Sequence, residues 1–545
     1  MNNSANVDRA VNIAALASRD FDVLVIGGGI TGAGVARDAA LRGLSVALVE
    51  RDDFASGTSS RSSRLIHGGL RYLEHGYLHL VFESSAERRR LLELAPHLVH
   101  PLAFTWPVYR GARAGRWKLA AGLMLYELLA LWRNVRRHRR LDAEGVAERE
   151  PALRREGLTG GAVYYDAATD DARLTLANVL GAAAAGAVIA NHCEVRALTI
   201  ENGRATGASV TNLLDGGRID VRARVIVNAA GPWTDSIRRM EEPNAPTTVR
   251  GTKGAHIAVP RDRVGNRDAL TLLSPIDGRV MFILPAGERT IVGTTDTETG
   301  ASPDEVRATT ADVDYLLRSA NAFFPDARLE RSDVVSAWAG IRPLIAGGFG
   351  DGPSSASREH AIAHTPAGVV AITGGKLTTY RVMAAEIVDV VLKALDRGQV
   401  DCRTGELPLP GGDIESVEGE IERAIAESGD AAVARHLVRR YGSEWTDVWR
   451  MAASDAALRT PVVDELPDLC AELRYGAERE MACTLADLLI RRTHIAFATR
   501  DNGRGAAVVA ATVVAPVFGW SEAGVRAQLM DYEREVARIF AIGDV

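Results

Sequence analysis

Cationic residues and glycines gather in one short stretch of the chain, SSRSSRLIHGGLRYLEHG at residues 59–76. The stretch contains three arginines, two histidines and a Gly-Gly pair. The planar guanidinium of arginine makes bidentate contacts with phosphate oxygens, and histidine gains or loses a proton near neutral pH. Glycine lets the backbone approach a ligand closely. The stretch therefore predicts a site for an anionic molecule.

The elements just before this stretch form a nucleotide-binding βαβ pattern. An apolar run at 21–26, FDVLVI, precedes glycines spaced Gly27-x-Gly29-x-x-Gly32, a small-residue helix and a second apolar run. Such glycines permit a tight turn, close approach of backbone to a pyrophosphate and close helix packing. Glu50 ends the second run, where a carboxylate can accept hydrogen bonds from a ribose. This full context favours a dinucleotide site over a glycine turn that binds nothing.

Length, charge and cysteine usage bound the class of protein. A chain of 545 residues exceeds what one hydrophobic core usually organises, so two or three domains are expected. The net charge of -6 argues against a nucleic-acid-binding role for the whole chain, because such proteins carry a basic excess. The four cysteines are widely spaced and predict reduced thiols, with no metal site. The N-terminus lacks the pattern of a secretion signal, which predicts a cytoplasmic protein.

Later strand-like runs predict that the nucleotide domain is discontinuous. ARVIVNAAGPW (223–233) and GVVAITGGKLTTYR (368–381) each run from a buried-type strand into glycine, and both are expected to return to the sheet of the βαβ unit. The sequence between them is typical of antiparallel strands. A Pro/Gly linker follows residue 400, and beyond it the pattern is helical.

An ordered set of motifs covers nearly the whole chain. The set comprises GGGITGAG, TSSRSSRLIHGGLRYLEHG, DDARLTLAN, AGPW, KGAHI, GTTD, GIRPL and GGKLTTYR before an LPGG linker. In this order the motifs resemble the FAD-dependent, aerobic and quinone-linked glycerol-3-phosphate dehydrogenases. The resemblance implies an α/β plus α fold: a Rossmann-like FAD-binding domain of the glutathione-reductase type, an antiparallel β substrate domain and a helical C-terminal domain.

The domain ranges follow from the strand pattern and this resemblance. The expected domains are a discontinuous FAD-binding domain (20–100, 165–245 and 335–398), a substrate and membrane-facing domain (101–164 and 246–334) and a helical C-terminal domain (405–545).

The resemblance also implies the ligands and the residues that bind them. FAD is the implied cofactor and sn-glycerol 3-phosphate the implied substrate, whose phosphate dianion explains the need for cations. The implied substrate-binding residues are Arg71, Tyr72, Arg342, Arg358 and Lys376. The implied cofactor-binding residues are Gly27, Gly29, Ile30, Thr31, Gly32, Glu50, Thr58, Ser59, Ser60, Leu65, His67, Val195, Ala230, Gly231, Gly375, Lys376 and Leu377.

The implied reaction moves a hydride from substrate C2 to flavin N5 and yields dihydroxyacetone phosphate. Three residues, Arg342, His67 and His256, are candidates for taking the C2 hydroxyl proton or stabilising the alkoxide. Arginine stays protonated and is a poor base, whereas the resemblance favours Arg342, so the identity of the base is left open. The flavin is expected to be held without a covalent bond, and attachment through His67 is the alternative.

Other polar residues near these motifs have structural explanations. Arg61 is expected to be a solvated surface charge, and a surface position also competes with substrate binding for Arg358. Asp170 and Asp171 fit the N-cap of the helix that follows them better than an acid–base pair.

A basic segment at 110–140 indicates contact with a membrane. It carries nine lysines and arginines against one acid, Glu127, and they flank an apolar run with Trp117 and Trp132 near its ends. The run is too short to span a bilayer but fits an amphipathic helix lying on an anionic surface. A buried helix with solvated basic ends is the alternative. Membrane contact favours a quinone as electron acceptor and a peripheral position on the cytoplasmic face of the cell membrane.

Three rival functions fit the sequence less well. A soluble glycerol-3-phosphate oxidase would keep the site and pass electrons to oxygen. A flavin-containing tRNA-modifying protein would need a basic groove with aromatic residues, and the acidic chain has only 6% aromatic residues. An amino-acid oxidase would not require so many cations. The expected partners are therefore the substrate and a membrane quinone, without nucleic acid, and a homodimer is compatible with the sequence.

Overall fold

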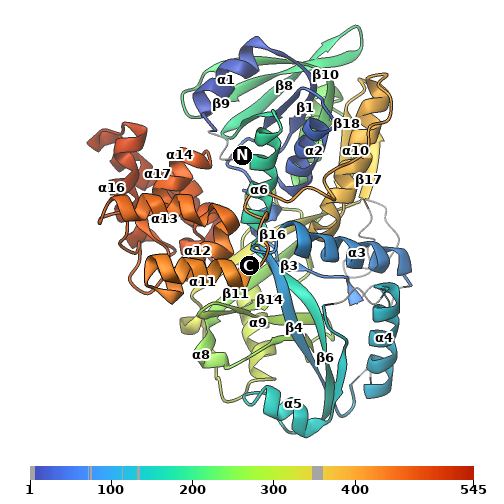
Figure 1. The fold of residues 1–545 in the computed structure, drawn as a ribbon. Coiled ribbons are helices and arrows are strands. Elements are labelled where there is room, and N and C mark those ends of the chain that lie inside the picture. The colour runs from blue at the N-terminus through green and yellow to red at the C-terminus, as the bar shows by residue number, and fades with distance from the viewer. Residues whose placement is uncertain are drawn as a thin grey trace.

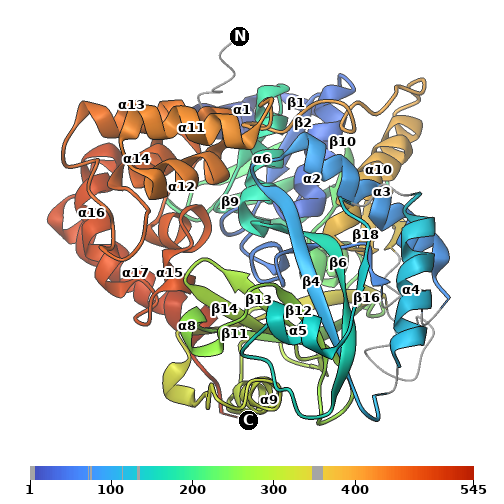
Figure 2. The ribbon, with the colours of Figure 1, turned by 60° about the horizontal axis from the view of Figure 1, so that its bottom comes forward.

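A computed structural model describes residues 7–70, 73, 76–112, 115–131, 135–345 and 360–544. Helix α1 (Arg9–Ser18) precedes the first strand. Two β-sheets and a C-terminal group of helices follow (Figure 1). In two views the C-terminal helices lie on one side of the molecule and helix α4 (Arg116–Leu129) on the other (Figures 1 and 2).

The first sheet contains the βαβ unit expected from the sequence. In sheet order its strands are β17 (His360–His364), β18 (Val370–Gly374), β10 (Arg218–Asn228), β1 (Asp20–Ile26), β2 (Val46–Val49) and β7 (Val188–Ala190), with β9 (Arg204–Asn212) and β8 (Cys193–Glu201) continuing from β10. The β1–β2, β1–β10 and β10–β18 pairs are parallel. The segments at 223–233 and 368–381 therefore do return to this sheet, as predicted. Parallel strands covered by helices are buried on both faces, which explains their apolar sequences.

Three helices pack together next to this sheet. Helix α2 (Ile30–Leu41) contacts both α6 (Asp171–Ala184) and α10 (Tyr380–Ala394). Small residues allow this approach, because a Cβ at Gly34 would lie 2.9 Å from the ring of Tyr380. Asp170 Oδ1 accepts the amide N–H of Arg173 at 2.9 Å, which confirms the predicted N-cap of α6.

The second sheet is mostly antiparallel, as expected. In order its strands are β15 (Thr297–Glu298), β11 (Val249–Pro260), β14 (Arg289–Gly293), β13 (Val280–Ala286), β12 (Ala269–Leu273), β4 (Val99–Tyr109), β6 (Leu158–Thr169) and β3 (Leu65–Ile66), with β16 (Ser336–Ile345) beside β11 and β5 (Arg139–Leu141) beside β6. The remaining helices before the C-terminal domain are α3 (Leu78–Leu94), α5 (Ala143–Arg149), α7 (Thr234–Glu241), α8 (Arg261–Val264) and α9 (Thr310–Asn321).

Strand β16 lies in a different sheet from the one expected. The range 335–398 was expected in the nucleotide domain, but β16 pairs antiparallel with β11 from Val249↔Ile345 to Ala258↔Ser336. An isolated apolar run gives no information about its partner strand. The pairing places Arg342 on the second sheet, opposite Thr252 of β11.

The C-terminal domain is helical, as predicted. Its helices are α11 (Val417–Ser428), α12 (Ala431–Tyr441), α13 (Trp445–Ser454), α14 (Cys470–Arg479), the π-helix η7 (Asp487–Arg492), α15 (Ile495–Ala498), α16 (Arg504–Phe518) and α17 (Glu522–Phe540). A short 3₁₀ turn, η6 (Gly442–Glu444), joins α12 to α13, and those elsewhere are η1 (Thr58–Ser60), η3 (Gly231–Trp233), η4 (Arg331–Asp333) and η5 (Leu377–Thr379). The domain packs on the second sheet through aromatic contacts such as Trp338 against Phe497, with ring centroids 5.2 Å apart. The four cysteines are free thiols, as expected.

Candidate active site

One cavity of about 540 Å³ is lined by residues of both sheets. Among the residues expected from the sequence, those that line it are Gly27, Gly29, Ile30, Thr31, Glu50, Thr58, Ser59, Leu65, His67, Val195, Ala230, Gly231, His256, Arg342, Gly375, Lys376 and Leu377. The fold thus brings the two separately predicted groups, nucleotide-binding and cationic, to the same space. Arg71, Tyr72 and Arg358 lie outside the described residues.

Glycines build the nucleotide end of the cavity from backbone. Gly27 has a φ of +109°, which disfavours any other residue. A Cβ at Gly32 would lie 1.9 Å from the Gly27 carbonyl oxygen, so Gly32 packs behind the cavity wall and does not line it. The amide N–H of Ile30, at the start of α2, donates to Ser59 Oγ at 2.9 Å. Gly29, Ile30 and Thr31 line the cavity, so the positive end of α2 opens on it, as an anion site requires.

Ser60 was expected to contact the cofactor but is buried behind the cavity. Its neighbour Thr58 lines the cavity, and Thr58 Oγ1 donates to the Ile341 carbonyl oxygen at 2.6 Å. In the 3₁₀ turn η1, successive side chains point about 120° apart, so adjacent residues cannot all face one cavity. Through the hydrogen bond from Thr58, the turn η1 connects the loop after β2 to β16.

Glu50 is fixed by backbone at the end of β2. Its Oε2 accepts the amide N–H of Gly28 at 2.6 Å, and its Oε1 accepts that of Asp52 at 3.0 Å. Burial raises the pKa of Glu50, the nearby Asp52 carboxylate raises it further, and the two amides act in the opposite direction. A carboxylate held in this way presents fixed acceptors to the cavity.

Arg342 reaches the cavity from β16 in a fixed orientation. Its guanidinium donates to Asp296 Oδ1 and Thr294 Oγ1, both at 3.0 Å, and to the Thr295 carbonyl oxygen at 3.3 Å. These three partners belong to the GTTD motif, which sequence reasoning noted without giving it a role. Because arginine remains protonated, the motif supplies a fixed positive charge.

His256 lies on β11 beside this charge. Its Nε2 is 2.8 Å from Ser63 Oγ, and its ring stacks on Trp338 with centroids 5.5 Å apart. Burial lowers the pKa of His256 to about 3, with smaller contributions from Arg342 and Arg64. The imidazole is therefore neutral at physiological pH. Ser63 was not among the predicted site residues, although it belongs to the arginine- and serine-rich stretch.

Lys376 and His67 face the cavity from segments that contact each other. Lys376 Nζ donates to Ser84 Oγ of α3 at 3.3 Å. The His67 carbonyl oxygen accepts Thr378 Oγ1 at 3.4 Å. The turn after β18 and the Gly-Gly segment after β3 therefore form one wall.

The prediction that Arg61 is a solvated surface residue was wrong. Arg61 is 7% exposed, lines the cavity and lies near Glu535 and Arg538 of α17. Burial and, to a smaller extent, the like charge of Arg538 lower the pKa of Arg61 to about 10. The covering helix comes from the far end of the chain, so no local pattern could reveal the burial.

Three more cavity residues had no predicted role. The Arg51 guanidinium lies 5.0 Å from the ring centroid of Trp233 and contacts Asp304 Oδ1 at 2.5 Å. Trp233 Nε1 donates to the same oxygen at 3.2 Å. The available signals were weak: Arg51 directly follows Glu50, and Trp233 ends the AGPW motif.

The parallel sheet, the glycine turn before α2 and the cavity define a dinucleotide-binding protein. The family "FAD dependent oxidoreductase" matches residues 22–381, and "C-terminal domain of alpha-glycerophosphate oxidase" matches residues 402–525.

Relatives with named activities cover nearly the whole chain. Glycerol-3-phosphate dehydrogenase 2 of Mycobacterium tuberculosis is 42% identical over 540 residues, covering 98% of this chain and 90% of that protein. The aerobic glycerol-3-phosphate dehydrogenase of Staphylococcus haemolyticus is 37% identical, covering 90% and 89%. The crystal structure of glycerol-3-phosphate dehydrogenase from Bacillus halodurans complexed with FAD superposes with a TM-score of 0.82 at 32% identity, covering 98% of each chain. The chain therefore belongs to the FAD-dependent glycerol-3-phosphate dehydrogenase family.

The residues of the cavity fit FAD. The cradle at Gly27 and Gly32 leaves no room for a Cβ, as close approach of a pyrophosphate requires. The N-terminus of α2 supplies partial positive charge for phosphates, and Glu50 supplies acceptors for hydroxyl groups.

Proposed function

We propose that the protein oxidises sn-glycerol 3-phosphate to dihydroxyacetone phosphate with FAD and passes the electrons to a membrane quinone. The observation that carries this proposal is the meeting of Arg342 and Lys376 with the Gly27–Glu50 nucleotide end in one cavity. The named relatives act on the same substrate according to their names. A small phosphate ester needs fixed cations close to the flavin position, and this cavity provides them.

The nucleotide end would hold FAD through Gly29, Ser59 and the N-terminus of α2 at the pyrophosphate, and through Glu50 at the ribose. When bound, FAD supplies a hydride acceptor at flavin N5.

Lys376 would bind the substrate phosphate, joined on the basis of the family resemblance by Arg71, Tyr72 and Arg358. Arg342, whose orientation is fixed by Asp296, would contact the C2 hydroxyl and so hold C2 in one position. As the C2–H bond breaks, the C2 hydroxyl must lose its proton to give the ketone.

The proton leaves toward a residue that is not already protonated. His256 is neutral, since burial lowers its pKa to about 3. His67 lines the same cavity. A pKa of about 3 makes His256 a weak proton acceptor, so His67 is the better candidate for taking the proton, whereas Arg342 stays charged and stabilises the developing alkoxide. The two roles are therefore divided between a histidine and Arg342.

Helix α4 supports the membrane part of the proposal. Leu119, Leu123 and Tyr126 face the protein, while the opposite face exposes apolar side chains. Those exposed on α4 and just after it are Trp117 (80%), Met124 (51%), Leu125 (38%), Leu128 (54%), Leu131 (49%) and Val135 (39%). A cluster of this kind on a surface favours contact with an apolar phase. None of the described helices is long and apolar enough to cross a bilayer.

Exposed basic side chains lie on α4 and in the segment that follows it, and the Arg140 guanidinium lies 5.4 Å from the ring centroid of Trp117. Those exposed in 115–118 and 135–140 are Arg116, Lys118, Arg136, Arg137, Arg139 and Arg140. The segment's single acid, Glu127, is buried and pairs with His138 Nδ1 at 3.0 Å. The exposed side therefore presents apolar and cationic groups together, which suits an anionic lipid surface.

The membrane proposal is tested by replacing Arg136, Arg137, Arg139 and Arg140 with glutamine. Each basic residue near an anionic surface contributes about 1 kcal/mol, so binding to anionic vesicles at low salt should weaken by roughly a thousandfold. Quinone-linked turnover should fall with it, and turnover with a soluble dye should persist. The matched control replaces four exposed arginines elsewhere: Arg218, Arg222, Arg224 and Arg450.

Transfer of electrons to oxygen is the competing outcome. If the unaltered protein does not sediment with anionic vesicles and yields one peroxide per substrate oxidised, the protein is an oxidase and the membrane proposal fails. Because residues 402–525 match the family of the oxidase C-terminal domain, peroxide yield must be measured beside quinone-linked turnover.

A further inference from the structure

The C-terminal domain contacts the loop of the nucleotide end through a buried charge cluster. Asp53, three residues after Glu50, is fully buried and accepts Arg491 Nε at 2.7 Å. Arg492 makes a bidentate contact with the same carboxylate, at 2.7 and 3.0 Å. Asn191 Nδ2 donates to Asp53 Oδ1 at 2.9 Å. Both arginines belong to the π-helix η7, so one helix of the C-terminal domain holds this loop.

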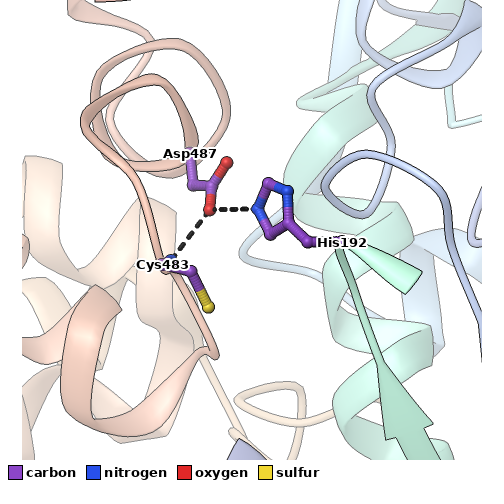
Figure 3. A group of neighbouring side chains, drawn as sticks. All are labelled: His192, Cys483 and Asp487. Carbon is purple, nitrogen blue, oxygen red and sulfur yellow. Dashed lines mark hydrogen bonds and ion pairs between the residues drawn. The ribbon is translucent and has the colours of Figure 1, made fainter. Parts of the chain in front are cut away.

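The same helix holds a second segment of the first sheet (Figure 3). His192, between β7 and β8, has its Nε2 2.9 Å from Asp487 Oδ2, the oxygen that also accepts the amide N–H of Cys483 at 2.8 Å. The three side chains lie close enough together to suggest a metal site. However, Asp487 Oδ1 already accepts Arg491 Nη2 at 2.8 Å, so a cation would lie against a guanidinium. The group is better explained as a contact between domains.

Both contacts bear on the position of Glu50. The Glu50 amide donates to the Ala190 carbonyl oxygen at 2.9 Å, and its own carbonyl accepts the Cys193 amide at 2.7 Å. The His192 amide donates to the Asp52 carbonyl oxygen at 2.7 Å. Glu50, Asp52 and Cys193 line the cavity. A shift of Asp53 or His192 would therefore move the backbone that carries Glu50.

We propose that helix η7 is a positioning element of the cofactor site, and that retention of FAD depends on the C-terminal domain through Arg491, Arg492 and Asp487. None of the three lines the cavity, so they act through Asp53 and His192 and do not touch the cofactor themselves. A π-helix is uncommon and is often found at functional sites. Here it places two consecutive arginines, Arg491 and Arg492, on one carboxylate. The inference depends on FAD occupying the cavity and is independent of the electron acceptor.

The test compares two conservative variants of buried arginines. In Arg492→Lys, an ammonium cannot reproduce the bidentate contact with Asp53. In the control Arg42→Lys, the arginine is also buried and pairs with Asp38 at 2.7 Å and Asp389 at 2.5 Å, away from the loop. Two quantities are measured on the holoenzyme without turnover: the rate of FAD release, followed by flavin fluorescence, and the increase in melting temperature that FAD gives over the apoprotein.

Arg492→Lys should release FAD about tenfold faster and show a smaller FAD-dependent increase in melting temperature. Arg42→Lys should lower the melting temperature of both forms and leave the release rate and the increase unchanged. Equal effects of the two variants, or wild-type release in Arg492→Lys, would overturn the proposal. Asp487→Asn, which removes the ion pair with His192, should change release in the same direction, and it replaces Arg492→Lys if that variant does not fold.

Discussion

The two ends of the cavity are built in different ways. The glycine cradle and Glu50 of the nucleotide end come from one continuous segment, in which glycines and backbone amides make the contacts and Glu50 is the main side chain. At the substrate end, Arg342, His256 and Lys376 come from β16, β11 and the turn after β18. The glycine cradle forms by short-range geometry within a local segment. The substrate end exists only when both sheets have formed and packed together. The two ends should therefore respond differently to mutation.

The largest effect is expected at the backbone of the nucleotide end, from Gly32→Ala. The new Cβ would lie 1.9 Å from the Gly27 carbonyl oxygen, so α2 and the turn before it must separate. We expect purified Gly32→Ala protein to contain no flavin, as measured by its visible absorbance. Gly398→Ala is the control, because a Cβ there meets no atom within 4 Å. Full flavin content in Gly32→Ala would show that the cradle is not needed.

At the substrate end, Arg342→Ala should reduce kcat/KM by about a thousandfold, since truncating one member of a buried hydrogen-bonded charge pair costs about 2–5 kcal/mol. The loss removes a cation from the cavity and leaves Asp296 unpaired. Flavin content should be unchanged. The double variant Arg342→Ala, Asp296→Asn separates the two causes: activity should stay low while stability recovers. Retention of activity in Arg342→Ala would exclude Arg342 from the reaction site.

An intermediate effect is expected from Glu50→Ala. Hydrogen bonds to a charged group contribute about 1.5–3 kcal/mol, so the Kd for FAD should rise by about 10- to 150-fold. The KM for the substrate should stay constant in the fraction that retains flavin, because Glu50 lies at the other end. Titration of the apoprotein with FAD measures the first quantity. An unchanged Kd would remove Glu50 from the cofactor site.

The smallest effect concerns the pH dependence contributed by His256. Its pKa is lowered to about 3 in the folded protein, so the unfolded chain takes up a proton as pH falls below the ordinary histidine pKa of about 6.5 while the folded chain does not. Stability contributed at this position is therefore present above that pH and is lost as pH falls toward 3. Between pH 7 and pH 5, wild type should lose about 2 kcal/mol more unfolding free energy than His256→Asn in urea titrations. Equal losses would mean that His256 is protonated in the fold.

The same contrast explains what could be predicted from the sequence. The βαβ unit, its glycines and Glu50 were predictable because strand, turn and helix signals lie within about thirty consecutive residues. The burial of Arg61 by α17 and the pairing of β16 with β11 were not, since each depends on contacts between distant segments. Arg342 and Lys376 were named through motif resemblance, and their partners Asp296 and Ser84 became visible only in the structure.

The most direct test of the account is anaerobic mixing of the flavin-loaded protein with sn-glycerol 3-phosphate or with glycerol, without nicotinamide. The cations at the substrate end serve the phosphate, so sn-glycerol 3-phosphate should bleach the flavin absorbance while glycerol at the same concentration should not. Arg342→Ala, with full flavin content, should bleach about a thousandfold more slowly. Equal bleaching by both alcohols, or no bleaching by either, would contradict the assignment of this cavity to the oxidation of a phosphate ester.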